Sequence, residues 1–128
     1  MGDFIRSLRA DDNKVHLFIK ELRASEIQHQ LNVPSEVLQR RPIFAEYSRD
    51  FSSLDDNGRP WKFILSIRRP PQYPKPCFNR SVWRSFVDEK GLRVGDVVEF
   101  YTLMASPGAG IQVRAWRQQP GGHHWRLV

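Results

Sequence analysis

Seven lysine or arginine side chains occur between residues 57 and 87, and no acidic residue lies among them. They are Arg59, Lys62, Arg68, Arg69, Lys75, Arg80 and Arg84. A guanidinium group can donate two parallel hydrogen bonds to a phosphate or to the edge of a guanine, and lysine adds a point charge. These side chains therefore favour binding of a polyanion, and nucleic acid fits best. The alternative is a basic surface that only keeps the protein soluble.

The middle of this basic run, residues 68–76, reads Arg-Arg-Pro-Pro-Gln-Tyr-Pro-Lys-Pro. Proline fixes its own φ angle and biases the residue before it toward an extended conformation. We therefore expect a semi-rigid arm that projects from the domain and can contact DNA. Its candidate DNA-binding residues are Arg68, Arg69, Gln72, Tyr73 and Lys75. The alternative is a solvated loop whose prolines keep the chain out of β pairing.

Positive charge is concentrated in the second half of the chain. The formal net charge is +6, and residues 1–56 contain ten acids and eight bases. Residues 57–128 contain four acids and twelve bases. This asymmetry predicts one positive face, which attracts polyanions.

The length of the chain predicts one domain. We expect it over residues 14–118, between a flexible leader (1–13) and a flexible tail (119–128). The single cysteine, Cys77, cannot form an intramolecular disulfide, which favours a reducing compartment. No signal peptide is visible, and no stretch approaches the roughly 18 apolar residues that a membrane span needs. We expect a soluble intracellular protein, nuclear or cytosolic.

Short strands separated by turns dominate the chain. The clearest strand is 61–67, which follows an Asn57-Gly58 hairpin turn. One face of it has Trp61, Phe63, Leu65 and Ile67, and the other has Lys62, Ile64, Ser66 and Arg68, as in a half-buried strand. Other expected strands are 15–20, 31–34, 43–54, 97–103 and 111–117. One helix is expected over 81–90 with Gly91 as its left-handed cap, and shorter helical turns are expected at 24–30 and 35–40. This pattern predicts a mostly β fold, and a closed or partly open barrel fits better than a flat sheet.

The large aromatic residues fit a core better than a stacking platform for single strands. Trp61 and Phe63 lie on the alternating face of a strand, and Trp83 and Phe86 lie on one stripe of the helix. We therefore expect all four to be buried.

Signals for an enzyme are weak. Cys77 has no histidine near it in sequence, and the pair at 123–124 lacks further ligands at zinc-like spacing. The glycines at 108 and 110 fit a hairpin tip, and Asp55-Asp56 fits a turn. We expect no catalytic residue, no cofactor and no metal.

Several pieces, in order, resemble the plant-specific B3 DNA-binding domain. They are Leu-Phe-Ile-Lys-Glu-Leu at 17–22, Ser-Glu-Ile at 25–27, Leu-Asn-Val-Pro at 31–34, Asp-Asn-Gly-Arg-Pro-Trp-Lys-Phe at 56–63, Trp-Arg-Ser-Phe-Val-Asp-Glu-Lys-Gly-Leu at 83–92 and Gly-Asp-Val-Val-Glu-Phe at 95–100. The last two pieces are the most specific, because a helix, a glycine cap and a Gly-Asp turn follow one another at fixed spacing. The resemblance covers about residues 15–117.

This resemblance implies a seven-stranded open pseudobarrel with two short α-helices, whose two arms enter the DNA major groove. The first arm would fall on about residues 20–32 and the second on about 67–75, which includes the proline-rich segment. The chain departs from the family pattern in a shorter, less charged stretch at 28–32 and in a second arm richer in proline. Both departures bear on which base sequence is recognised.

The first arm also contains candidate DNA-binding residues. Glutamine can pair with adenine through two hydrogen bonds, whereas lysine and arginine suit guanine or phosphate. The candidates are Lys20, Arg23, Ser25, Gln28, His29, Gln30 and Asn32, with Arg59 and Lys62 added for phosphate contacts. Arg80 and Arg84 are further phosphate candidates. The alternative is that Gln28 and Gln30 are only exposed loop residues and that Ser25 only caps a helical turn.

We therefore expect a nuclear, non-enzymatic domain that reads double-stranded DNA as part of a plant transcription regulator. Protein partners would bind regions outside this chain. One alternative is a protein-interaction module that kept the barrel and lost DNA affinity. Another is the DNA-reading domain of a restriction enzyme.

Overall fold

The computed structural model describes residues 2–37, 48–67, 76–122 and 124–128. Their helices are α1 (Gly2–Arg9), α2 (Ala24–Gln28), α4 (Arg80–Lys90) and the single 3-10 turn η1 (Pro107–Ala109). The strands are β1 (Lys14–Glu21), β2 (Leu31–Asn32), β3 (Ser48–Leu54), β4 (Pro60–Ser66), β5 (Cys77–Phe78), β6 (Val97–Leu103), β7 (Ile111–Gln118) and β8 (Trp125–Leu127). The expected helical turn at 35–40 and strand at 43–54 lie partly outside the described residues.

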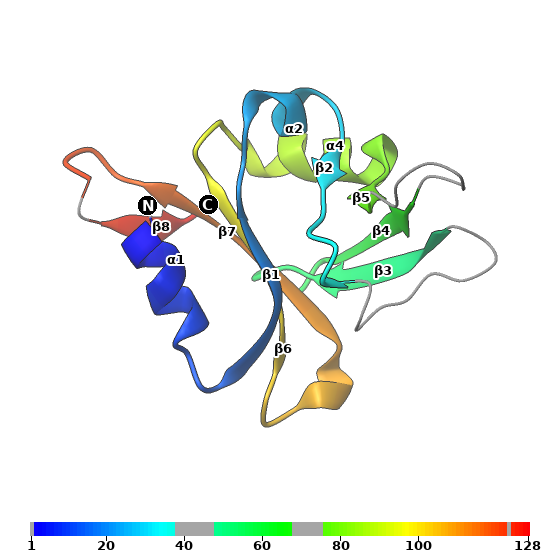
Figure 1. Ribbon diagram of the computed structural model, residues 1–128, viewed down its shortest axis with the longest axis horizontal. Helices are drawn as coiled ribbons and strands as arrows, with labels where there is room; N and C mark the ends of the chain where they lie inside the picture. The colour runs from blue at the N-terminus through cyan, green and yellow to red at the C-terminus, as the bar shows by residue number, and fades with distance from the viewer. Residues whose placement is uncertain (1, 38–47, 68–75, 123) are drawn as a thin grey trace.

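The strands form one curved sheet in the order β1-β6-β7-β3-β4-β5-β2, and β8 pairs with β7 (Figure 1). The pairs are antiparallel except β3 with β7, which is parallel. β1 and β2 are the two ends of this order and are not paired with each other, so the barrel is open. The predicted mostly β pseudobarrel is confirmed. The described residues contain eight strands and three α-helices, one of each more than expected.

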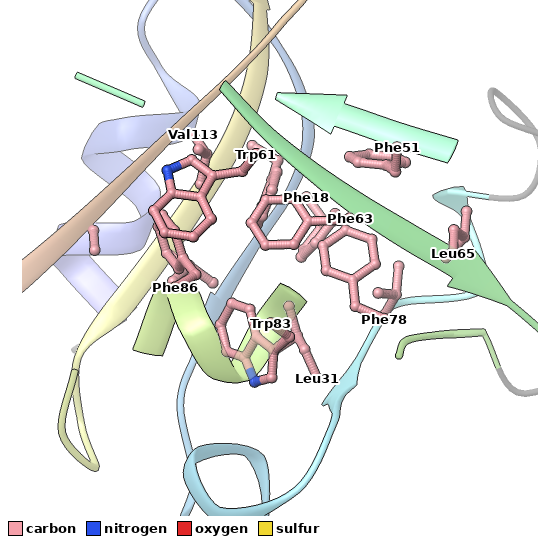
Figure 2. Packing of buried hydrophobic residues seen from close by; sticks show 14 of the residues in the cluster. Phe18, Leu31, Phe51, Trp61, Phe63, Leu65, Phe78, Trp83, Phe86 and Val113 are labelled. Carbon is pink, nitrogen blue, oxygen red and sulfur yellow. The ribbon is translucent and has the colours of Figure 1, made fainter. Parts of the chain in front are cut away.

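A core of aromatic rings fills the inside of the sheet. Phe18, Phe51, Phe63, Phe78 and Phe100 come from five different strands and have between 0 and 5% of their surface exposed. Figure 2 shows how rings from β1, β3, β4, β5 and α4 converge. The four aromatic residues expected in the core, Trp61, Phe63, Trp83 and Phe86, are all buried. The buried aromatic residues of these strands thus line the concave face of the barrel.

Helix α4 closes one end of this core. It begins after Asn79 instead of at the expected Ser81 cap, and it ends at Gly91, which has a φ of 63°. The N–H of Leu92 donates to the Val87 carbonyl at 3.0 Å, so Leu92 folds back onto the last turn as predicted. None of the helices in the described ranges is long and apolar enough to cross a membrane.

The two ends of the chain carry regular structure and pack on the outer face of the sheet. Phe4 of α1 stacks on Trp125 of β8 with ring centroids 4.3 Å apart and meets Trp116 edge-on at 5.5 Å. Leu8 is buried against Ile19 and Val97. Within the segments expected as a leader and a tail, Gly2–Arg9 thus forms a helix and Trp125–Leu127 a strand. The reason is that apolar residues at the two ends cover each other.

A buried carboxylate lies next to this contact. Glu99 has no exposed surface, and its Oε2 accepts from Lys14 Nζ at 3.1 Å and lies 2.7 Å from His16 Nε2. Its Oε1 accepts from the Trp116 indole at 3.1 Å. These contacts from β1 and β7 compensate the charge that β6 carries into the interior.

The β3–β4 hairpin is held by Asp55. Its Oδ1 accepts from the backbone N–H groups of Asn57 and Arg59, both at 2.9 Å, and its Oδ2 accepts from the Trp61 indole at 3.0 Å. Burial raises the pKa of the Asp55 carboxyl, but these hydrogen bonds and the charge of Lys90 outweigh burial and hold the pKa below its usual value. The carboxylate form therefore stabilises the predicted Asn57-Gly58 turn.

Asp55→Asn should lower the free energy of unfolding at pH 7 by about 1–3 kcal/mol, because the amide cannot accept all three hydrogen bonds. Chemical denaturation measures this loss. Asp56→Asn is the matched control, since Asp56 is more exposed and binds Lys90 at the surface. An equal loss in both variants would contradict the role given to Asp55.

The same carboxylate predicts a pH dependence. Because its pKa is lower in the folded than in the unfolded chain, its contribution is complete above the unfolded value, about 3.9, and is lost as the pH falls through the folded value. The stability difference between wild type and Asp55→Asn should therefore shrink below about pH 4. Denaturation curves at pH 7, 4 and 3 measure it, and a difference that grows on acidification would contradict the assignment.

Candidate nucleic-acid interface

A short three-strand strip brings the expected arms to one place. Asn32 of β2 pairs with Cys77 of β5, and Cys77 pairs with Ser66 of β4. One register step away, Leu31 pairs with Phe78, which pairs with Leu65. The end of the first expected arm and both ends of the second therefore lie side by side, although 45 residues separate Asn32 from Cys77 in the sequence.

The arms leave this strip at opposite ends. The first arm reaches it at Leu31, beside Phe78. The second arm leaves after Ser66 and returns at Cys77, beside Asn32. Adjacent residues in a strand are about 3.3 Å apart, so the two-residue strip is a narrow floor between the two arms.

Helix α4 fixes the position of the first arm. The Trp83 indole donates to the Glu26 carbonyl at 2.8 Å, and Arg84 Nη1 donates to the Ile27 carbonyl at 3.0 Å. Both acceptors belong to α2, a five-residue helix too short to be stable alone. Side chains of α4 therefore supply donors to these two carbonyls, and α4 fixes the position of the first arm.

An ion pair fastens the arm from the other side. Lys20 Nζ lies 2.5 Å from Glu26 Oε2 and donates to the Asn32 carbonyl at 2.7 Å. Glu26 is 1% exposed, and its Oε1 also accepts from the Arg23 N–H at 3.1 Å. Since Lys20 is on β1 and Asn32 is on β2, this ammonium group bridges the opening between the two unpaired ends of the sheet.

The remaining first-arm candidates face solvent. Leu22 and Glu26 are buried and Ile27 is half-buried, whereas the residues between Leu22 and Glu26 and those at 28–30 are exposed. The exposed candidates are Arg23, Ser25, Gln28, His29, Gln30 and Asn32. Their donors and acceptors are therefore placed on one projecting segment, whereas Lys20 is turned toward the protein.

The second-arm candidates, Arg68, Arg69, Gln72, Tyr73 and Lys75, lie outside the described residues. The base of that arm is described and is well bonded. The Val33 N–H donates to the Pro76 carbonyl at 3.0 Å, and Ser66 Oγ donates to Asn79 Oδ1 at 2.5 Å. Both ends of the segment are thus held on the same strip.

The other basic candidates lie away from the strip. Arg59 packs over the Trp61 ring at 4.3 Å and pairs with Glu89, at the end of β4 opposite to the second arm. Lys62 pairs with Asp50 across the hairpin at 3.3 Å. Arg84 is committed to α2 and to Asp88 at 3.3 Å, while Arg80 is exposed at the start of α4. Arg59 and Lys62 are therefore each bound to residues outside the strip.

Groups that could do catalysis are not assembled at this strip. Asp55 is used as a turn acceptor, as the sequence indicated, and Cys77 is half-buried within β5. Within the described ranges no three histidine, cysteine, aspartate or glutamate side chains could hold a metal ion.

Sequence reasoning missed the residues that position the first arm. Glu26 was absent from the candidates, and Arg84 was assigned only to a phosphate or a bland surface. The one signal available was that Lys20 and Glu26 carry opposite charges six residues apart within the arm. Lys20 lies on a strand and Glu26 on a helix, so no single periodicity connects them and the contact follows only from the fold.

Solved structures share this fold. An Arabidopsis FUS3–DNA complex aligns with a TM-score of 0.65 at 19% identity, covering 79% of this chain and 96% of that chain. The complex of the Arabidopsis thaliana transcription factor LEC2 with DNA gives 0.64 at 13%, covering 89% and 99%. A hypothetical Arabidopsis thaliana protein gives 0.55 at 21%, covering 83% and 93%. These likenesses confirm the expected B3-type fold.

No protein-family model matches the chain, and no curated protein matches it.

Replacing Lys20 by Met should loosen the first arm, because Glu26 is left buried without its cation. We expect a loss of about 1–3 kcal/mol in unfolding free energy and faster hydrogen exchange at the α2 amides. Hydrogen-exchange mass spectrometry of a peptide spanning residues 24–32 measures the local effect.

Lys62→Met is the matched control, since Lys62 is exposed and makes one surface ion pair. The double variant K20M/E26Q should recover part of the loss, because the unpaired charge is then gone. The bridging role would be contradicted if K20M exchanged faster across the whole chain, or if its α2 amides exchanged no faster than those of the wild type.

Proposed function

We propose that this chain is a B3-type domain that binds double-stranded DNA. Its two arms enter one major groove and read bases, and the domain is the DNA-reading part of a plant transcription regulator that acts in the nucleus. The reading needs no cofactor, metal or catalytic residue. The two Arabidopsis complexes contain DNA, and one of these proteins is described as a transcription factor, which supports the proposal.

One observation carries the proposal. Pairing of Asn32 with Cys77, and of Cys77 with Ser66, places the exposed first arm and the base of the cationic second arm on either side of one strip. A duplex lying over that strip would have hydrogen-bonding side chains on both sides. The major groove is about 12 Å wide and presents a distinct pattern for each base pair, so elements of this size can enter it.

The side chains divide between base reading and phosphate binding. Gln28 and Gln30 carry amides that can make paired hydrogen bonds with adenine, and Arg69 can do so with guanine. Arg23, His29, Arg68 and Lys75 supply positive or hydrogen-bonding groups for the backbone. Ser25, Asn32, Gln72 and Tyr73 add polar contacts at the arm surfaces. Lys20 keeps the first arm in position through Glu26.

Arg69→Ala tests base reading by the second arm. Binding to the preferred duplex should weaken by about 1–3 kcal/mol, whereas binding to a random duplex should change much less. Fluorescence anisotropy with labelled duplexes measures both constants. Arg6→Ala removes the same charge from exposed α1 and is the control. Equal losses on both duplexes would reassign Arg69 to phosphate contact.

The preferred duplex comes from selection of bound sequences out of a random duplex pool, which also tests the function itself. We expect a short enriched motif and an affinity that falls steeply with salt, because phosphate binding releases counterions. No enriched motif, with an affinity that stays flat between 50 and 200 mM salt, would contradict DNA reading and favour a protein-interaction module.

A further inference from the structure

A basic hollow lies beside the first arm, outside the strip. It encloses about 760 Å³ between the turn after α4 and the hairpin that joins β7 to β8. Its lining includes Arg93, Arg117 and Arg126, together with the polar residues Gln118 and Gln119. Among the described residues that line it, none has an acidic side chain. The charged side chains of the lining are therefore all basic.

Arg117 forms a fixed wall of this hollow. Its Nε and Nη2 donate to the two oxygens of Asp96 at 3.0 and 2.8 Å, and Nη2 also donates to the Gly91 carbonyl at 2.7 Å. The hydrogen bonds that Arg117 donates to Asp96 raise the pKa of its guanidinium group, which therefore keeps its charge. Asp96 is 2% exposed, so this carboxylate is occupied by Arg117 and by the Arg93 N–H at 2.8 Å.

The other two guanidinium groups, of Arg93 and Arg126, add positive charge beside Arg117. Arg126 of β8 is paired directly across from Arg117 of β7, so two like charges face each other on one side of the sheet. Like charges directly opposite each other destabilise a sheet, and Asp96 neutralises only Arg117, so Arg126 is the charge that an added anion would meet. Arg93 and Arg126 are both exposed, whereas Arg117 is mostly covered. This arrangement favours an anion as ligand.

The hollow is connected to the first arm through the backbone. The Leu22 N–H donates to the Asp96 carbonyl at 2.8 Å, and the Gly95 N–H donates to the Leu22 carbonyl at 2.9 Å. Leu22 directly precedes Arg23, an exposed residue of that arm. The turn that carries Arg93 is therefore bonded to the base of the arm, and Figure 1 shows this turn between α2 and the β7–β8 hairpin.

We propose that this hollow is a phosphate-binding site, with Arg93 and Arg126 as mobile ligands and Arg117 as the fixed one. Its volume is within the range of small-ligand sites, about 300–1,000 Å³, and guanidinium groups match phosphate geometry. The phosphate belongs to the DNA backbone where the duplex extends beyond the recognised bases, an assignment that rests on the proposed function. A free polyphosphate is the other source with the same chemistry.

The site itself is tested without DNA. Inorganic tripolyphosphate is titrated into the wild-type chain and into R93Q/R126Q at 50 mM salt, with calorimetry for affinity and backbone amide NMR shifts for location. Affinity should fall about tenfold or more in the double variant, and the wild-type shifts should include Gly122 and Arg126. R6Q/R9Q removes the same charge from exposed positions of α1 and is the control. No tripolyphosphate binding, or equal weakening in the control, would overturn the site.

The source of the phosphate is tested with two duplexes that share the selected motif. One ends at the motif, and the other continues for ten base pairs on each side. R93Q/R126Q should weaken the longer duplex about tenfold more than the shorter one. Equal effects on both duplexes would overturn the backbone assignment. If neither duplex binds wild-type protein, the proposed function fails, and the tripolyphosphate titration still decides whether the hollow binds phosphate.

Discussion

The bridge made by Lys20 is the contact on which the arrangement of the arms depends. Because the pseudobarrel does not close, β1 and β2 lie at the two ends of the sheet and are not paired with each other. Lys20 spans this opening by binding Glu26 of α2 and the Asn32 carbonyl of β2. Because Glu26 is almost fully buried, loss of Lys20 would leave an uncompensated charge in the interior, which is strongly destabilising. The Lys20 ammonium group thus connects β1 to α2 and β2, where the two strands form no backbone hydrogen bonds with each other.

The open end also explains why a projecting arm can be rigid. A closed barrel would use the edges of β1 and β2 for each other and would leave no room for α2 between them. Here α2 takes its hydrogen bonds from Trp83 and Arg84 of α4, and α4 is packed against the phenylalanine core by Phe86. The core therefore holds α4 in place, and α4 in turn holds the first arm. A preorganised arm loses little conformational freedom on binding, which favours affinity.

Local patterns were enough to predict much of the fold. Alternation identified β4, Asn57-Gly58 identified its hairpin, and the stripe ending at Gly91 identified α4, since each signal depends on neighbouring residues. The packing of the two ends of the chain could not be predicted in this way. Phe4, Ile5 and Leu8 have helical spacing, but Phe4 stacks on Trp125 at the opposite end of the sequence, and that contact follows only from the fold. The same holds for the candidate site: exposed residues of the first arm followed from the family resemblance, whereas the roles of Glu26 and Arg84 required the fold.

In the proposed complex, both arms contact one duplex over the strip formed by β2, β5 and β4. NMR titration of the isotope-labelled chain with a short duplex that carries the selected motif tests this arrangement. We expect amide shifts to concentrate in residues 23–32 and 67–76, with little change in α1. Shifts confined to α1 and the outer face of β1 and β6, with none in either arm, would contradict it.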